Sequence, residues 1–375
     1  MNLKVIPLHA NDYESAEEWA MFHEENGEQM TSAVLTTADS RYSGGFLPTL
    51  LIGGVATYPE YRRFGCVRRI LESAFEQAPE RGWVVSLLHP FSFAYYRKFG
   101  YEKVSDHRLL EFPMKALDFV PRCPNLKLVD RPERVTDALK VYDTFAENRN
   151  IMFRRFDDRC YSLKPHEDNR STYVWYNSQG VPSSYVTVGV EKSLVVNHFE
   201  SVNLHVYEQA YTSPQSLMAI LGFLRMYEGE LDSVKIHNCA MCPELDFVLR
   251  HYTHTRYHQV PDVMARVLDV KALLEANRYP QAGGHFTIRV EDTLPFTTGT
   301  YRVEYEKGKA EVTRLSQDAP YDLLAPMQAF TQLVYGYEHY TADNAVYLPG
   351  VRLENSAEDF FAAFPKRNNG LFEHF

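Results

Sequence analysis

The sequence predicts an α/β protein, α+β in its last part, that divides into three domains. Three observations support this prediction. The chain of 375 residues is longer than one hydrophobic core usually organises. Its hydrophobic content of 45% is enough to fill several cores, so disorder is not expected. Short apolar runs typical of strands alternate with segments of helical periodicity along most of the chain.

The first domain is expected over residues 1–118, because proline punctuates the sequence from 112 to 124. Its predicted elements are a strand at 3–7, a short helix at 13–19, a hairpin of 20–23 with 30–36, a strand at 47–55, a helix from about residue 67, a strand at 83–88 and a short helix at 91–101. Apolar residues at Val67, Ile70, Leu71 and Phe75 recur at helical spacing and indicate the longer helix.

The second domain is expected over residues 119–278 and the third over 279–375. In the second, helices are predicted at 135–148 and 214–227, and strands at 171–175, 184–190, 234–238 and 264–268. In the third, strands are predicted at 285–290, 299–306 and 309–315, followed by helices at 326–334 and 357–364. The second domain repeats the α/β order of the first in outline.

The junction between the strand at 47–55 and the following helix is a candidate phosphate site. It contains Gly65 and four arginines, with no acidic residue after Glu60. Positive side chains are unfavourable at a helix N-terminus, and the free amides there need an acceptor. A bound polyanion satisfies both the amides and the guanidinium groups. The alternative is that these arginines form a solvated helix face.

The order of strand, Arg-x-x-Gly turn, helix, strand and a helix ending in Tyr-x-x-Phe-Gly-Tyr resembles the acyl-CoA site of the GNAT acetyltransferase superfamily. The resemblance implies that Arg62-x-x-Gly65-x-Val67 is the pyrophosphate loop and that Tyr96 protonates the departing thiolate. The coenzyme-binding residues it implies are Val55, Ala56, Thr57, Arg62, Arg63, Gly65, Cys66 and Val67. The alternative for Tyr96 is an ordinary packed aromatic residue.

Nearly the whole chain resembles the Eis (enhanced intracellular survival) family of GNAT N-acetyltransferases. The resemblance rests on the first-domain motif, on residues 265–273 at the close of the second domain, and on a strand-rich C-terminal part that ends in phenylalanine. It implies a catalytic GNAT domain, a second GNAT-like domain without a cofactor site, and a sterol-carrier-protein-like α+β domain. Each GNAT-like domain would have a mixed, mostly antiparallel sheet with flanking helices.

The family resemblance also implies a mechanism. An amine acceptor, such as an aminoglycoside, a polyamine or lysine, attacks acetyl-CoA directly, and the terminal carboxylate of Phe375 is the general base. Glu373 and His374 are alternative bases nearby. Some family members form hexamers, so a homo-oligomer is expected. Family members usually have two substantial helices where this chain has only residues 9–19, so the acceptor cleft is expected to differ.

Bulk properties narrow the classes of function. A net charge of −10 argues against nucleic-acid binding, and no apolar run or signal peptide indicates a membrane, so a cytoplasmic protein is expected. Five cysteines without a secretory signal suggest reduced thiols. Cys239-x-x-Cys242 with His251, His254 and His258 matches zinc patterns only loosely, so no metal is expected. The alternative function is a non-catalytic acyl-CoA or lipid sensor.

Overall fold

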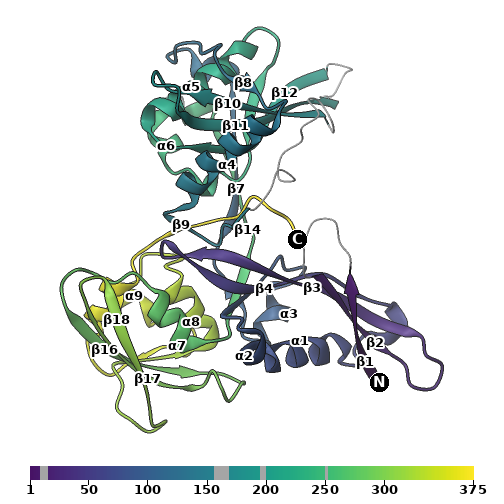
Figure 1. Ribbon diagram of the computed structural model, residues 1–375, viewed down its shortest axis with the longest axis vertical. Helices are drawn as coiled ribbons and strands as arrows, with labels where there is room; N and C mark the ends of the chain where they lie inside the picture. The colour runs from purple at the N-terminus through teal and green to yellow at the C-terminus, as the bar shows by residue number, and fades with distance from the viewer. Residues whose placement is uncertain (9–15, 156–168, 195–199, 250–251) are drawn as a thin grey trace. The chain divides into compact units, whose positions relative to one another are not determined.

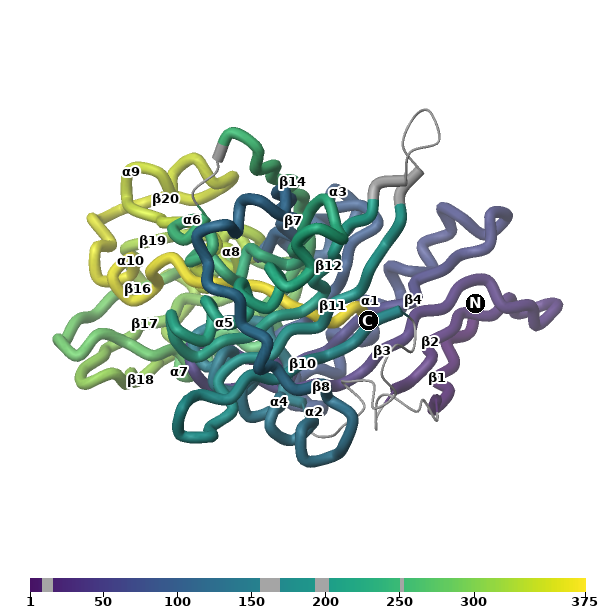
Figure 2. The backbone as a smooth tube through the Cα atoms, turned by 90° about the horizontal axis from the view of Figure 1, so that it is seen from above, coloured from purple at the N-terminus to yellow at the C-terminus, as the bar shows by residue number. Residues whose placement is uncertain are grey.

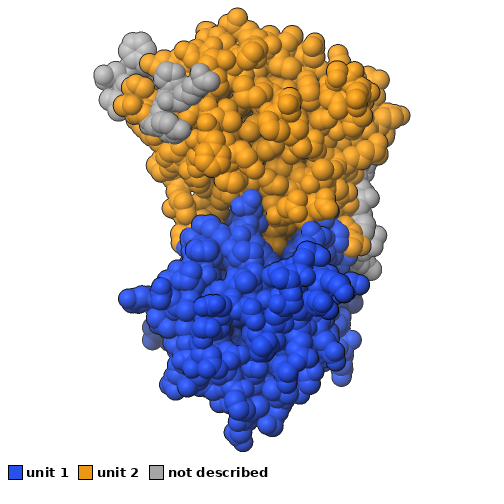
Figure 3. Space-filling model, turned by 90° about the vertical axis from the view of Figure 1, so that its left-hand side faces the viewer, with its two compact units in different colours: residues 1–105, 262–369, 373–375 blue, residues 106–261, 370–372 orange. Residues whose placement is uncertain are grey.

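The computed structural model describes residues 1–8, 16–155, 169–194, 200–249 and 252–375. They form two compact units, coloured separately in Figure 3. Unit 1 draws on residues 1–105, 262–369 and 373–375, and unit 2 on residues 106–261 and 370–372. The domain boundaries expected at 118 and 278 stay a prediction.

A seven-stranded mixed sheet organises the first part of unit 1, in the order β1-β2-β3-β4-β5-β15-β6. Figure 1 labels its strands β1 to β4. Its strands are β1 (Asn2–Leu8), β2 (Ala16–Phe22), β3 (Gln29–Tyr42), β4 (Gly45–Thr57), β5 (Val85–Leu88), β15 (Met264–Val267) and β6 (Glu102–Lys103). The antiparallel meander of β1 to β4 can be followed in Figure 2. Among the described strand pairs of this sheet, only β4 and β5 are parallel, so the predicted mixed, mostly antiparallel sheet is confirmed.

Helix α1 (Cys66–Glu76) connects β4 to β5, together with the short α2 (Ala78–Arg81). It buries Ile70, Leu71 and Phe75, which lie at the helical spacing seen in the sequence. These side chains pack with Trp19 of β2 and Leu50 of β4 in one hydrophobic cluster. The helix therefore covers one face of the sheet and fixes where its own N-terminus lies beside β4.

Residues 16–19 correct one prediction, because they belong to β2 and not to a helix at 13–19. The other predicted residues, 13–15, lie outside the described residues. β2 pairs antiparallel with β1 on one side and with β3 on the other, with Trp19 opposite Val5 and Ala33. Pairing on both edges and full burial of Trp19 override the helical propensity of the Ala-Glu-Glu stretch.

The strand predicted at 264–268 is β15, and it lies in the first sheet between β5 and β6. Its Arg266 is fully buried, donates to the Phe99 carbonyl and forms an ion pair with Asp292 at 2.6 Å. A side chain on Gly100 would collide with this guanidinium group. Arg266 thus fixes the turn that follows α3 (Phe93–Arg97).

The C-terminal part of unit 1 is a five-stranded sheet with flanking helices, which contains the three predicted strands and two that were not predicted. The sheet order is β18-β17-β16-β19-β20, with β16 (Gly284–Glu291), β17 (Gly299–Glu306), β18 (Lys309–Leu315), β19 (Leu323–Pro326) and β20 (Arg352–Leu353). The helices are α7 (Val270–Ala276), α8 (Met327–Val334), α9 (Ala342–Ala345) and α10 (Glu358–Ala363), and the two-residue β21 (Asn368–Asn369) follows. Phe286 and Phe360 pack edge to face with ring centroids 5.2 Å apart, which joins α10 to β16.

Unit 2 contains a second seven-stranded sheet, in the order β14-β7-β13-β12-β11-β10-β8. Its strands are β7 (Asp106–Pro113), β8 (Lys127–Leu128), β10 (Arg170–Tyr176), β11 (Pro182–Leu194), β12 (Glu200–Tyr211), β13 (Ser233–Ile236) and β14 (Arg256–Pro261), with β9 (Arg149–Asn150) outside the sheet. The helices are α4 (Pro132–Ala146), α5 (Pro214–Leu224) and α6 (Glu244–Val248). The Ser213-Pro214 start signal is confirmed, because Ser213 caps α5 through the amide of Ser216.

Candidate active site

The parallel pair of β4 and β5 opens at one end. The pairing runs from Thr49 opposite Val85 to Ile52 opposite Leu88, where β5 ends, whereas β4 continues to Thr57. On its other edge β4 has a bulge, since its register with β3 shifts between Ser32 and Val34. No strand of the described chain covers the β5 side of β4 after Ile52. From Val55 to Thr57 this part of β4 lines a cleft.

The loop before α1 has the backbone form of an anion site. Arg63 and Gly65 adopt left-handed conformations, with φ of 70° and 78°. No side chain caps α1, and its first internal hydrogen bond runs from the Arg69 amide to the Gly65 carbonyl at 3.1 Å. The amides of Cys66, Val67 and Arg68 therefore have no acceptor within the helix. Such free amides at a helix start attract an anion.

A cleft of about 830 Å³ lies between the open part of β4 and this loop. It is lined by Val55, Ala56, Thr57, Tyr61, Arg62, Arg63, Gly65, Cys66, Val67, Arg68, Phe91, Tyr95, Lys98 and Phe99. The cleft thus brings together all eight residues expected to hold the coenzyme. The cleft lining also contains residues that were not predicted to bind the coenzyme: Tyr61, Arg68, Phe91, Tyr95, Lys98 and Phe99. For Phe91 and Tyr95, the Phe-x-x-x-Tyr pattern at helical spacing is the sequence signal that could have indicated them.

Tyr96 is almost fully buried on α3, which begins with Ser92 accepting the Tyr95 amide. Its ring is enclosed by Phe91, Tyr95 and Tyr101, with centroids 5.2, 5.4 and 6.0 Å away. Burial raises the pKa of its phenol, so the group stays protonated. Among the described residues its hydroxyl has no hydrogen-bond partner. It is therefore a proton donor without an acceptor.

The chain ends against β4. A methyl group on Gly53 would lie 2.8 Å from the carboxyl carbon of Phe375 and 3.0 Å from its oxygen. The φ of Gly53 lies outside the left-handed region, so space for the carboxylate, rather than backbone conformation, requires glycine here. The terminal carboxylate lies one residue beyond the last pair of β4 with β5.

His89, immediately after β5, contacts the same C-terminal segment. Its ring is 5.0 Å from the ring of Phe375 and 4.9 Å from that of His374. Its Nδ1 lies 3.0 Å from Oδ1 of Asp262, and its Nε2 lies 3.4 Å from the carbonyl oxygen of Glu373. The sequence reasoning missed His89 and Asp262, because 173 residues separate them and no local pattern joins them.

The cysteine pair of unit 2 is part of its core. Cys239 donates to the Arg108 carbonyl at 3.0 Å, and both Cys239 and Cys242 are buried. Burial raises their pKa values to about 12 and about 11, so both remain thiols. In the part of the chain that the structure describes, no group of three or more His, Cys, Asp or Glu side chains is arranged to hold a metal. His251 lies outside that part.

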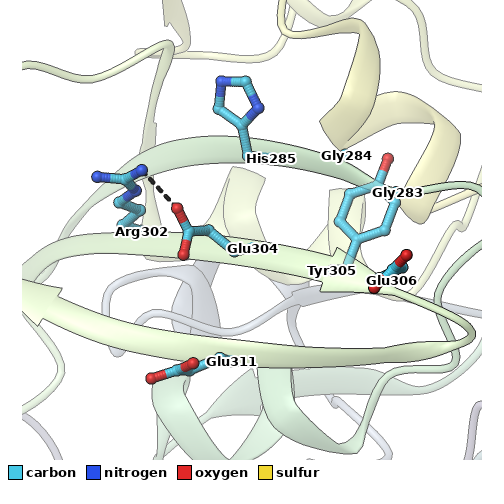
Figure 4. A pocket seen from close by; sticks show the side chains of 8 residues that line it. All are labelled: Gly283, Gly284, His285, Arg302, Glu304, Tyr305, Glu306 and Glu311. Carbon is cyan, nitrogen blue, oxygen red and sulfur yellow. Dashed lines mark hydrogen bonds and ion pairs between the residues drawn. The ribbon is translucent and has the colours of Figure 1, made fainter.

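The C-terminal sheet has a separate hollow of about 470 Å³ on β16, β17 and β18 (Figure 4). Its lining is charged. Figure 4 shows Arg302 paired with Glu304, while Glu306, Glu311 and His285 surround them. A charged hollow does not suit an apolar ligand, so it gives no support to a lipid-carrier function.

Comparison with known families gives the class of this protein. Residues 8–104 match the acetyltransferase (GNAT) domain, and residues 270–369 match the sterol carrier protein domain. The chain thus contains both domains expected from the sequence, and the predicted enzyme class, an acyltransferase, is confirmed at the level of its GNAT domain. No curated protein matches the chain. Within the described residues, no helix combines the length and apolarity needed to cross a membrane.

Solved structures share the fold over 96% of this chain. They include a probable N-acyltransferase from Enterococcus faecalis V583 (TM-score 0.78, 20% identity, 89% of that chain covered). A GCN5-related N-acetyltransferase from Anabaena variabilis ATCC 29413 has a TM-score of 0.80 at 17% identity, with 89% of it covered. Eis1 from Mycobacterium abscessus has a TM-score of 0.76 at 18% identity, with 91% covered. The expected Eis-like architecture is therefore confirmed as a fold.

Proposed function

We propose that this protein is an acetyl-CoA-dependent N-acetyltransferase in which an acceptor amine attacks the thioester directly. The observation that carries the proposal is the terminal carboxylate of Phe375 against Gly53, where β4 parts from β5. The carboxylate thus lies beside β4 two residues before Val55, the first β4 residue that lines the cleft with the anion site. This is the arrangement that acyl transfer to an amine needs.

The cleft suits coenzyme A along its whole length. The pyrophosphate would accept hydrogen bonds from the free amides at the start of α1 and pair with Arg62 and Arg63. The pantetheine arm would lie along the open edge of β4, where Val55 and Thr57 line the cleft. Its amide groups would then pair with backbone groups that no strand covers.

The chemistry requires two proton transfers. The carboxylate of Phe375 takes a proton from the acceptor ammonium group through a water molecule, and the amine nitrogen then forms a bond to the thioester carbon. The carbon–sulfur bond breaks, and Tyr96 gives its proton to the thiolate. An α-carboxyl group has an ordinary pKa near 3.5, so it is ionised at neutral pH but is a weak base unless it is desolvated. The buried phenol of Tyr96 is protonated and ready to donate.

The acceptor is proposed to be a cationic primary amine, in a small molecule or a peptide. The net charge of −10 favours such a partner over an anionic one. Resemblance to the Eis family supports aminoglycosides, polyamines and lysine as the first compounds to test, and supports a homo-oligomeric assembly.

The proposal is tested by following thiol release from acetyl-CoA with a panel of polyamines, aminoglycosides and lysine peptides. Acceptor-dependent release, with a mass increase of one acetyl group on the acceptor, is expected. Tight binding of acetyl-CoA without release for any acceptor would favour the sensor function instead.

A further inference from the structure

We propose that His89 and Asp262 form a pair that positions the C-terminal tail, and thereby holds the terminal carboxylate at Gly53. The inference rests on the proposed role of Phe375 as the general base. It assigns a positioning function to two residues that no sequence motif marks. All of the groups involved, including residues 373–375, belong to unit 1.

His89 follows directly on β5, so the sheet fixes its backbone beside the open end of β4. Asp262 is fixed as well, because its amide donates to the Ser105 carbonyl at 3.1 Å just before β15 enters the same sheet. Residues 373–375 of the tail, in contrast, belong to no helix or strand of the described chain. The pair therefore holds the tail beside the sheet through the contact of His89 with Glu373.

The two ring nitrogens of His89 contact different partners. The carboxylate of Asp262 and the carbonyl of Glu373 both act as acceptors, and they face opposite nitrogens of one imidazole ring. One imidazole ring thus links the Asp262 carboxylate to the backbone of the tail. The side chains of His89 and Asp262 are only 21% and 14% exposed, so solvent screens the pair weakly.

A chain end needs contacts of this kind if its carboxylate is to act as a base. The last residues of a chain are usually disordered unless other groups hold them. A base must lie within hydrogen-bond reach of its proton, and a misplacement of about 1 Å can cost about a hundredfold in rate. The ring contacts of His89 with His374 and Phe375 orient the same segment from one side. Together, these ring contacts and the contact of His89 with the Glu373 carbonyl fix the orientation of residues 373–375.

The test uses the full chain and measures the tail directly. Carboxypeptidase A removes a C-terminal phenylalanine only when the tail leaves its site, so the release of free phenylalanine reports tail docking. His89→Ala and Asp262→Asn should each increase the initial release rate about tenfold, as expected for the loss of a hydrogen bond to a charged group. Since both act through one pair, the double variant should be no faster than the faster single variant. His285→Ala, at an exposed position on β16, is the matched control and should not change the rate.

The outcomes separate this inference from the proposed function. In the same variants, turnover with an amine acceptor should fall while the affinity for acetyl-CoA is unchanged. Faster release with unchanged turnover would support the positioning pair and contradict the role of Phe375 as a base. Unchanged release in both single variants would overturn the positioning pair, whatever their activity. If His89→Ala fails to fold, as seen by circular dichroism, Asp262→Asn retains the imidazole ring and decides the question.

Discussion

At the scale of single residues, the proposed site depends on the immediate surroundings of one phenol and one carboxylate. The phenol of Tyr96 is buried among three aromatic rings, and this burial raises its pKa above that of an ordinary tyrosine. The terminal carboxylate lies against a residue that has no side chain. Both observations lead to substitutions that change one atom or one methyl group.

Tyr96→Phe removes one hydroxyl and should lower kcat about a hundredfold, because a positioned acid typically contributes about 10²–10⁴ in rate. The affinity for acetyl-CoA should be unchanged, since the cleft lining stays intact. Tyr95→Phe is the matched control, as Tyr95 is adjacent and lines the same cleft. Because burial raises the pKa of Tyr96, wild-type kcat should not decline through pH 9–10 from loss of this proton. Equal kcat for wild type and Tyr96→Phe would remove the residue from the mechanism.

Gly53→Ala should displace the terminal carboxylate, because the new methyl group would lie 2.8 Å from its carbon. Turnover should fall at least tenfold, whereas the melting temperature should change little, since the φ of Gly53 suits alanine. Gly45→Ala is a suitable comparison, because its nearest neighbour would be 3.7 Å away. Full activity in Gly53→Ala would show that the tail is not needed at this position.

At the scale of elements, the sequence predicted the strands and helices that carry the site, and the reasons are local. The apolar run at 47–55, the arginine-rich turn and the periodicity of α1 all lie within 30 residues. The prediction was wrong at 16–19 because strand pairing on both edges decided the structure. β12 was missed, although the alternation of Val202, Leu204 and Val206 with polar residues was available as a signal.

The loop before α1 should control coenzyme affinity and not the chemical step. Arg62→Ala should weaken acetyl-CoA binding about tenfold, because one charge-assisted contact to the pyrophosphate is lost. Binding of acetyl-pantetheine, which has no pyrophosphate, should be unaffected. Isothermal titration calorimetry with both ligands measures this difference, and Arg69→Ala, outside the cleft lining, serves as the control. A similar loss for both ligands would contradict a pyrophosphate site here.

In unit 2, the histidines on β12 and after β13 should make stability depend on pH. Burial and the neighbouring His205 and His107 lower the pKa of His237 to about 4. The folded state therefore keeps His237 neutral, while the unfolded state takes up a proton near pH 6.5. Stability should be full above that pH and decrease as the pH falls from about 6.5 towards 4. Denaturant midpoints at pH 7.5 and pH 5 test this, and His237→Gln should reduce the difference between them.

At the scale of the whole molecule, the site joins residues from distant parts of the sequence. Gly53, His89, Asp262 and Phe375 come together only because β15 enters the first sheet and the chain end returns to β4. Family resemblance predicted the role of Phe375, but nothing local in the sequence predicts its neighbours, since their contacts span more than 100 residues. The position of the tail therefore depends on the whole fold and not on the local sequence.

The central claim is that the terminal carboxylate itself acts as the base, and extension of the chain by one glycine after Phe375 tests it most directly. The extension moves the carboxylate by one residue and leaves every side chain in place. We predict that kcat with an amine acceptor falls at least tenfold, while acetyl-CoA affinity and melting temperature stay at wild-type values. An extended chain that turns over at the wild-type rate would contradict the claim.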